Sequence, residues 1–220
     1  MTKNATIVSW EDSYETGIVL IDNQHKELVN LINELYSACL SGDAGAAFRE
    51  AMQPGFRDYS KKIVENCQAL AESCIQNGLE VLTGGTDNHL ILVNVRNLKD
   101  PSITGRQAES ALHECNVTVN RNSLPNDPNG PWYTSGLRIG TAAITTLGMG
   151  KAEMAELGAV IALILKGTFP SIKDGKPNKA KYEIDQAVKT EALDRIKKLL
   201  DRFPVYPELD LELLKGAFIN

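Results

Sequence analysis

Apolar residues recur at intervals of three or four in several stretches of the chain, and this is the spacing that lines one face of an α-helix. The clearest stretches are residues 28–39, 56–74, 108–115, 154–165 and 188–200. Gly78 and Gly167 follow two of them and are natural C-caps, because glycine adopts the left-handed backbone at low cost. The pattern therefore predicts a chain rich in amphipathic and buried helices.

Polar residues and prolines mark where helices begin. A shorter helical pattern from about Gly45 reaches Pro54, and a proline there must end the helix, kink it or open a new first turn. Thr104 and Gln107 have the spacing of a capping box, in which each side chain bonds the other's backbone amide. Asp185 precedes the last helical stretch as an N-cap. We expect helix starts at these sites.

The hydrophobic pattern changes to that of extended chain at residues 80–83, 89–95, 117–120 and 136–139. The first two segments flank Gly84-Gly85-Thr86-Asp87-Asn88, which predicts a turn between two strands. Residues 124–131 and the polar residues 168–182 are typical of exposed loops. Helices and strands alternating over residues 55–220 indicate an α/β or α+β sandwich, a small sheet covered by helices. Residues 1–43 have the different character of an N-terminal helical appendage.

Composition narrows the class of protein. The chain has 220 residues, 43% hydrophobic and 23% charged, which suits one well-buried globular domain with a small extra piece. Its net charge of −5 argues against nucleic acid as a partner. No apolar run approaches the roughly 20 residues of a membrane span, and the first residues lack the pattern of a signal peptide. We therefore expect a cytoplasmic protein with no membrane partner.

The four cysteines are spaced without a C-x-x-C pair. Cys39, Cys67, Cys74 and Cys115 lie on the apolar faces of expected helices. This placement favours reduced thiols in the core over disulfides or a metal site.

The first 43 residues contain an ordered pattern of motifs, which are Trp10, Tyr14, Gly17-Ile18, Ile21-Asp22, Gln24-His25-Lys26 and Leu31-Ile32-Asn33. This pattern resembles the opening arm and first helix of bacterial hemerythrins. It implies that His25 is an iron ligand in an oxygen-binding four-helix bundle. Such a site needs further imidazoles and carboxylates from facing helices, and His89 and His113 lack those partners. One copy therefore cannot complete the iron site, and residue chemistry favours a His25 that packs beside its apolar neighbours.

From about residue 46 onward the chain contains a long series of short motifs. In chain order they are Gln53-Pro54-Gly55-Phe56, Glu65-Asn66, Gly84-Gly85-Thr86-Asp87-Asn88-His89-Leu90, Val117-Thr118-Val119-Asn120 with Asn122, Pro125-Asn126-Asp127-Pro128, Thr134-Ser135-Gly136-Leu137-Arg138-Ile139-Gly140-Thr141, Gly148-Met149-Gly150, Asn178-Lys179-Ala180-Lys181-Tyr182 and Phe203-Pro204-Val205-Tyr206. This series resembles the C-terminal part of serine hydroxymethyltransferase. We therefore assign residues 1–45 to a hemerythrin-like segment and residues 46–220 to this C-terminal domain.

This resemblance implies a fold-type I pyridoxal phosphate enzyme that interconverts serine and glycine and passes one carbon to tetrahydrofolate. In the family, the cofactor lysine lies in a Thr-rich His-Lys segment of a large domain. The His25-Lys26 pair is the one His-Lys of this sequence, and its neighbours do not match that segment. A coenzyme-dependent reaction needs an anchor for the coenzyme. We therefore expect no turnover by this chain alone and assign it no catalytic and no cofactor-binding residue.

Two residues are candidates for substrate binding. By resemblance, Arg138 pairs with the α-carboxylate of serine or glycine, and a planar guanidinium suits that contact because it gives two parallel hydrogen bonds. By resemblance, Asn122 contacts the folate, and from residue type alone it is as well explained as a turn residue. Asp87, Asn88 and His89 belong to a motif that we interpret as structural. Ala142 and Leu147 depart from the family pattern.

Three functional hypotheses follow. The first is a serine hydroxymethyltransferase domain that works only with a separate large domain or in a homo-oligomer. The second is an iron- or oxygen-binding protein in which several copies share His25. The third is a non-catalytic fusion fragment whose fold survives because residues from about 55 onward have their own core.

Overall fold

The computed structural model describes residue 51 and residues 53–205. The chain divides into two units, Met1–Asp58 and Tyr59–Asn220. The hemerythrin-like segment, its candidate iron ligand His25, Cys39 and the expected boundary near residue 45 lie outside the described residues. They remain predictions.

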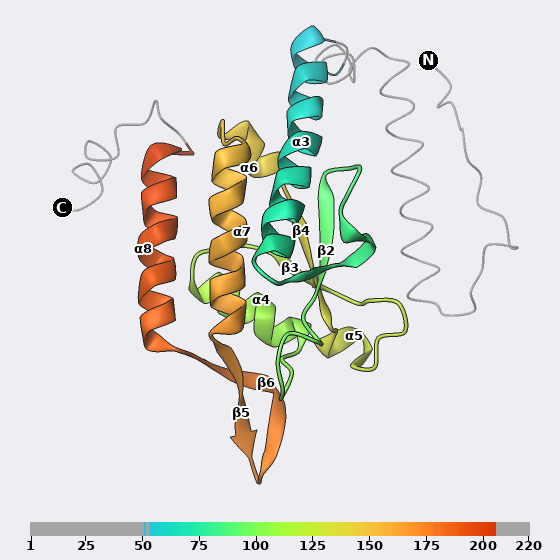
Figure 1. Cartoon of the computed structure of the whole chain (residues 1–220), viewed down its shortest axis with the longest axis vertical. Coiled ribbons are helices and arrows are strands. Elements are labelled where there is room, and N and C mark those ends of the chain that lie inside the picture. Colours follow the sequence, from blue (N-terminus) through green and yellow to red (C-terminus); the bar gives the residue numbers. More distant parts are fainter. Residues whose placement is uncertain (1–50, 52, 206–220) are drawn as a thin grey trace, which may run out of the picture. The chain divides into compact units, whose positions relative to one another are not determined.

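The described helices and strands alternate along the chain, as the sequence predicts (Figure 1). The helices are α3 (Pro54–Gln76), α4 (Gly105–Glu114), α5 (Gly130–Tyr133), α6 (Ala142–Thr146), α7 (Lys151–Lys166) and α8 (Gln186–Arg202), with a short 3-10 helix at Leu82–Gly84. The strands are β1 (Glu80–Val81), β2 (Leu90–Asn94), β3 (Asn120–Asn122), β4 (Gly136–Gly140), β5 (Thr168–Lys173) and β6 (Lys176–Ile184).

A four-stranded antiparallel sheet with the order β1-β2-β4-β3 organises the unit of residues 59–220. Alternate residues of its central strands, such as Ile91, Val93, Leu137 and Ile139, are buried in one core with residues of α3, α4 and α7. The helices therefore cover one face of the sheet (Figure 1). This arrangement confirms the expected fold class, a small sheet covered by helices.

Local signals place several helix ends where the sequence predicts them. Helix α3 begins at Pro54, and it ends before Gly78, whose φ of +77° is a left-handed conformation. The Leu79 amide then donates to the Cys74 carbonyl oxygen at 2.9 Å, which satisfies an acceptor in the last turn. Helix α7 ends at Lys166 with Gly167 as its C-cap.

The capping box at the start of α4 is confirmed. Gln107 N donates to Thr104 Oγ1 at 3.2 Å, and Thr104 N donates to Gln107 Oε1 at 2.8 Å. The same two side chains also donate to backbone carbonyls of β6, with Gln107 Nε2 only 2.7 Å from the Asn178 oxygen. The cap of α4 is therefore also a tertiary contact. Asp185 caps α8 through its bonds to the amides of Ala187 and Val188.

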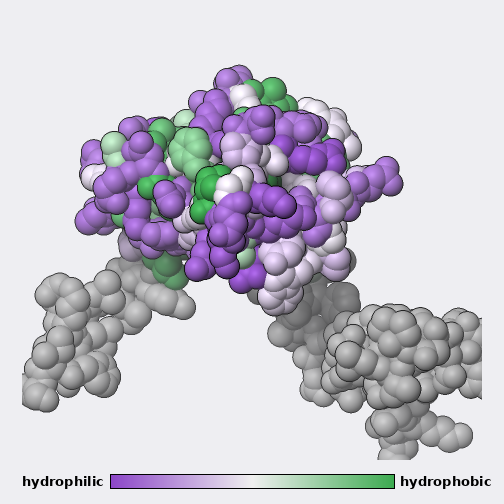
Figure 2. Space-filling model, turned by 90° about the horizontal axis from the view of Figure 1, so that it is seen from below, coloured by the Kyte–Doolittle hydropathy of each residue, from purple (hydrophilic) through white to green (hydrophobic). Residues whose placement is uncertain are grey.

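Two sequence interpretations are wrong in detail. Residues 168–182 are not an exposed loop: they belong to the β5–β6 hairpin, where Tyr182 and Ile184 pack against the core while neighbouring lysines point outward. The strand expected at residues 117–120 is instead β3 at Asn120–Asn122, because its extent is set by pairing with β4. Figure 2 shows the end of the molecule that carries the hairpin, and hydrophilic residues dominate it.

Cys67, Cys74 and Cys115 are buried free thiols, as expected. Burial raises the pKa of the Cys74 thiol to about 12, with a further contribution from Cys67. Among the described helices, none combines the length and apolar character that crossing a membrane requires.

Candidate functional site

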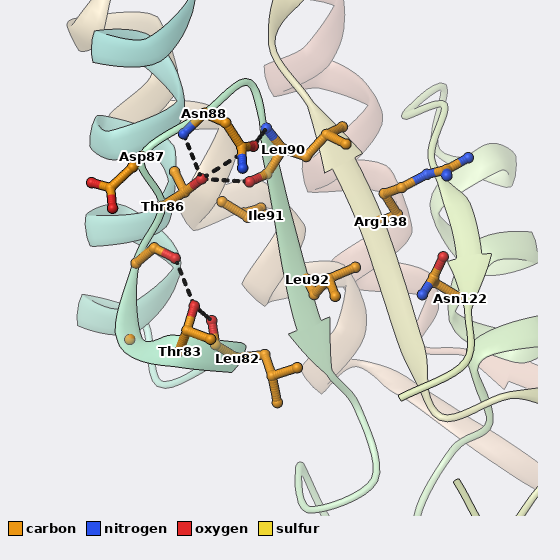
Figure 3. A pocket seen from close by; sticks show the side chains of 12 residues that line it. Leu82, Thr83, Thr86, Asp87, Asn88, Leu90, Ile91, Leu92, Asn122 and Arg138 are labelled. Atoms are coloured by element: carbon orange, nitrogen blue, oxygen red, sulfur yellow. Dashed lines mark hydrogen bonds between the residues drawn. The ribbon is translucent and has the colours of Figure 1, made fainter. Parts of the chain in front are cut away.

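A pocket of about 780 Å³ lies on the sheet beside the segment that joins β1 to β2 (Figure 3). Polar and apolar residues share its wall. The lining residues are Leu82, Thr83, Gly84, Gly85, Thr86, Asp87, Asn88, Leu90, Ile91, Leu92, Asn122 and Arg138. Both substrate-binding candidates from the sequence therefore line one pocket.

Strand register explains why Asn122 and Arg138 come together. Arg138 of β4 lies opposite Leu92 of β2 on one side and opposite Asn120 of β3 on the other. Because side chains alternate between faces, Asn122 leaves the sheet on the same face as Arg138. The buried neighbours Leu137 and Ile139 point to the opposite face, into the helical core.

The Arg138 guanidinium is available for a ligand. Arg138 is exposed, and no residue of the described part of the chain forms a hydrogen bond or ion pair with its side chain. Asp87 also lines the pocket, but Figure 3 places it at the other end, away from Arg138. An unpaired guanidinium can bind an anionic group through two parallel charge-assisted hydrogen bonds.

Asn122 adds hydrogen-bonding capacity beside that charge. Its Nδ2 donates to the Ser123 carbonyl oxygen at 2.7 Å, which leaves the second N–H and the Oδ1 acceptor unused by the described residues. Leu90 and Leu92 supply half-buried apolar surface on the same face. The site therefore combines a cation, an amide and an apolar strip, which can bind an anionic group and hydrogen-bond a ligand beside apolar surface.

The loop that walls the pocket is held by its own side chains. Asn88 Oδ1 accepts from the Leu90 amide at 2.8 Å, and Thr86 Oγ1 donates to the Leu90 carbonyl at 2.7 Å (Figure 3). These bonds fix the start of β2 and support a structural role for Asn88, while the interpretation of Asp87 and His89 stays a prediction. Thr83 has a φ of +68°, which is unusual for a β-branched residue and marks a strained turn at the pocket edge.

The departures from the family pattern lie away from this pocket. Ala142 begins α6, and its carbonyl oxygen accepts from the Tyr59 hydroxyl at 3.3 Å. Leu147 packs against the main core. Neither residue is among those that line the pocket.

The pocket lining does not fit a cofactor that must be held through a lysine. No lysine is among the lining residues, and their one cationic group is Arg138. A Schiff base to pyridoxal phosphate needs a lysine at the reacting position. Residues 51 and 53–205 contain no cluster of three histidine, cysteine, aspartate or glutamate side chains suited to a metal ion. His113 bonds the Val119 carbonyl at 2.9 Å, and His89 is exposed.

Comparison with known proteins identifies the family. The serine hydroxymethyltransferase sequence model matches residues 37–161. The serine hydroxymethyltransferase of Treponema pallidum (strain Nichols) is 49% identical over 173 residues, which are 78% of this chain and 30% of that protein. The enzyme of Chlamydia trachomatis serovar L2 is 43% identical over 206 residues, 90% of this chain and 40% of the relative. That of Salinispora tropica is 46% identical over 166 residues, 75% and 34% of the two chains.

The chain belongs to the serine hydroxymethyltransferase family. Members of this family use pyridoxal phosphate, act on serine, glycine and tetrahydrofolate, and form oligomers. The chain spans only 30–40% of the length of the relatives named above. The family match begins at residue 37, and the division of the chain near residue 45 stays a prediction.

Sequence reasoning missed the apolar part of the site. Leu82, Leu90 and Leu92 line the pocket but had no assigned role. Leu90, Ile91, Leu92 and Val93 are all apolar, so the sequence does not show which of them face the pocket and which face the helical core. The pairing of Leu92 with Arg138 decides it.

Proposed function

We propose that residues 46–220 are the C-terminal portion of a serine hydroxymethyltransferase and carry the part of the active site that binds substrate. In this proposal, Arg138 binds the α-carboxylate of serine or glycine, and Asn122 contacts tetrahydrofolate. The observation that carries it is the shared pocket, in which an unpaired guanidinium and a partly free amide lie on neighbouring strands. The family membership supplies the substrate class.

Arg138 suits this role because its planar fork matches the two oxygens of a carboxylate. It is also exposed to solvent, where a single ion pair contributes about 1 kcal/mol or less. Arg138 alone therefore selects the carboxylate and orients the amino acid, but it does not hold the substrate tightly. Most of the binding energy must come from groups that the described pocket does not contain.

Pyridoxal phosphate supplies the electron sink for the family's reaction when it is bound. Since no lysine lines the described pocket, we propose that the cofactor is held by a part of the enzyme outside these 220 residues, in a large domain or a partner subunit. On this view the chain contributes substrate-binding residues and no catalytic residue.

Complementation in trans tests this proposal. The chain is mixed with a large domain of the Treponema pallidum relative, pyridoxal phosphate, serine and tetrahydrofolate, and glycine formation is measured. We expect glycine only from the mixture, and glycine formation about fivefold slower or more when the chain carries Arg138→Ala. The control is Arg202→Ala, which removes an arginine bound to Glu153 at 2.7 Å, on α8. Full activity with Arg138→Ala, in a mixture that associates, would contradict the role of Arg138.

We also infer, as a second candidate, that the first residues form a hemerythrin-like segment in which several copies share His25 as an iron ligand. The sequence pattern around Gln24-His25-Lys26 supports it. Reconstitution with ferrous iron followed by metal analysis tests it. Iron that is lost in the His25→Ala variant would support the assignment, and a metal-free wild-type protein would contradict it.

A further inference from the structure

Asp127 lies in the long loop between β3 and β4 and accepts hydrogen bonds from both ends of that loop. Its Oδ2 accepts from the Leu124 amide at 3.1 Å and from the Ser135 amide at 2.7 Å. Its Oδ1 accepts from the Asn129 amide at 2.9 Å and from the Ser135 hydroxyl at 2.6 Å. One half-buried carboxylate therefore ties the exit of β3 to the entry of β4.

The tied positions are close in sequence to the two substrate-binding candidates. Leu124 comes two residues after Asn122, and Ser135 comes three residues before Arg138. Asn129 strengthens the same junction, because its side-chain amide donates to the Ser135 hydroxyl at 3.0 Å. No comparable side chain bridges β2 and β4, which are held by a five-residue ladder of their own within the described chain.

The Asp127 bridge can control the register of β3 on β4, that is, which residues of the two strands lie opposite one another. The β3–β4 ladder is three residues long, from Asn120 opposite Arg138 to Asn122 opposite Gly136. A slip of one residue would turn a side chain of β3 to the opposite face of the sheet. At Gly136 the fit is tight, since an added Cβ would lie 2.9 Å from the Asn122 carbonyl oxygen and 2.5 Å from Leu124 Cδ2. A short ladder that closes a long loop needs such support to keep Asn122 beside Arg138.

We propose that Asp127 is a positioning residue for the substrate pocket: its carboxylate sets the register of β3 on β4 and so places Asn122 beside Arg138. Asp127 acts through the backbone of these strands and does not line the pocket. The effect on substrate rests on the proposed function. The effect on strand register does not, and it is measured without substrate.

The charge state of Asp127 gives the proposal a pH signature. Burial by itself raises the pKa of this carboxyl, but its hydrogen bonds with Ser135, Asn129 and Leu124 outweigh burial and bring the pKa below its usual range. The groups that face it are neutral donors, and no charged side chain contributes to the shift. The bridge is therefore present at neutral pH and is lost as the pH falls through the lowered pKa.

Amide hydrogen exchange of the full chain tests the register claim. In Asp127→Asn, we expect the protection factors of β3 and of its partner residues in β4 to fall about tenfold or more, while those of β1 and of α7 stay within twofold of wild type. Ser135→Ala removes one of the donors and should give a smaller loss at the same amides. Asn66→Ala is the matched control, because it removes a buried amide that bonds Thr145 and Met149 on the helical side.

Two further measurements keep the proposal testable if Asp127→Asn does not fold. In the wild type, the protection of β3 relative to that of β1 should decrease as the pH is lowered through the pKa of Asp127. In the complemented enzyme, Ser135→Ala should raise KM for serine more than it lowers kcat. Equal loss of protection in all elements, or unchanged β3 protection in a folded Asp127→Asn, would overturn the proposal. A third outcome is possible: Asp127→Asn loses β3 protection, but the wild-type mixture forms no glycine. That result would support the register role of Asp127 and would contradict only the proposed function.

Discussion

Asn122 and Arg138 leave the sheet on the same face, two register positions apart on neighbouring antiparallel strands. The Arg138 guanidinium, which has no partner among the described residues, therefore lies near the Asn122 amide, which has unused hydrogen-bonding groups. It depends on non-local pairing, since the loop between the strands contains no tight hairpin turn. The substrate binding proposed for this chain depends on this pair of residues.

The geometry of the Arg138 side chain leads to a prediction about conservative replacement. Arg138→Lys keeps the positive charge but loses the planar fork, so glycine and serine should bind less well. In the complemented enzyme we expect KM for serine to rise about threefold. Steady-state kinetics checks this, with Arg202→Lys on α8 as the control. An unchanged KM would show that the substrate carboxylate binds elsewhere.

The capping box of α4 predicts a stability effect. Thr104→Ala removes the acceptor for the Gln107 amide and the donor to the Lys179 carbonyl, so the free energy of unfolding should fall by about 1–2 kcal/mol. Thr104→Ser keeps the hydroxyl and should recover most of that loss. Urea denaturation followed by circular dichroism measures both variants. Equal stability of the alanine and serine variants would contradict the role of the hydroxyl.

Gly158 lets α3 and α7 approach closely. A Cβ at this position would lie 2.4 Å from Ser73 Oγ and 3.1 Å from the Cys74 amide nitrogen. Gly158→Ala should therefore lower the free energy of unfolding by about 1–3 kcal/mol, although alanine favours helix. Gly55→Ala, on α3 with open space around it, is the control and should not destabilise. A stabilised Gly158→Ala protein would show that the two helices do not pack as described.

Acid should unfold this chain through carboxylates that are bonded in the folded state. The Arg195 guanidinium lowers the pKa of Glu156 against the opposing effect of burial, and hydrogen bonds with Lys189 and Tyr182 lower that of Glu114. A carboxyl whose pKa is lowered by folding stabilises the protein above its unfolded pKa of about 4.3. That stabilisation is lost as the pH falls through the folded pKa.

The free energy of unfolding should therefore be nearly constant from pH 7 to about pH 5 and then decrease. Urea titrations at a series of pH values check this. Glu156→Gln should flatten part of the decrease, because it removes one of the linked groups. Stability that rises on acidification would contradict these assignments.

Burial protects the thiols from alkylation. The thiolate is the reactive form, and burial raises the pKa of the Cys74 thiol to about 12. Cys67, Cys74 and Cys115 should therefore react with iodoacetamide only after denaturation. Mass spectrometry of digested, labelled protein reads out each site. Rapid labelling of Cys74 in the folded protein would contradict its place in the core.

Local signals were enough to predict much of the fold. Thr104, Gln107, Gly78 and Asp185 act within a few residues of their own positions, and the structure confirms each of these helix ends. The β5–β6 hairpin was missed because its lysine-rich sequence resembles a loop. Only contact with the core, through residues such as Tyr182, shows that alternate side chains point inward.

The site was predictable in part. Resemblance to a family indicated Arg138 and Asn122, and register brings them to one pocket. Leu92 and Asp127 were missed, because their importance depends on pairing across strands and on a loop closed by hydrogen bonds. Neither relationship can be predicted from the spacing of residues along the sequence.

We propose that the chain carries substrate-binding residues and does not hold pyridoxal phosphate through a lysine of its own. The most direct test is to incubate the purified chain with pyridoxal phosphate, reduce it with borohydride and map any modified lysine by mass spectrometry. We predict no lysine modified in stoichiometric amount, and no glycine formed from serine and tetrahydrofolate. A single lysine modified once per chain, together with glycine formation by the chain alone, would contradict the account.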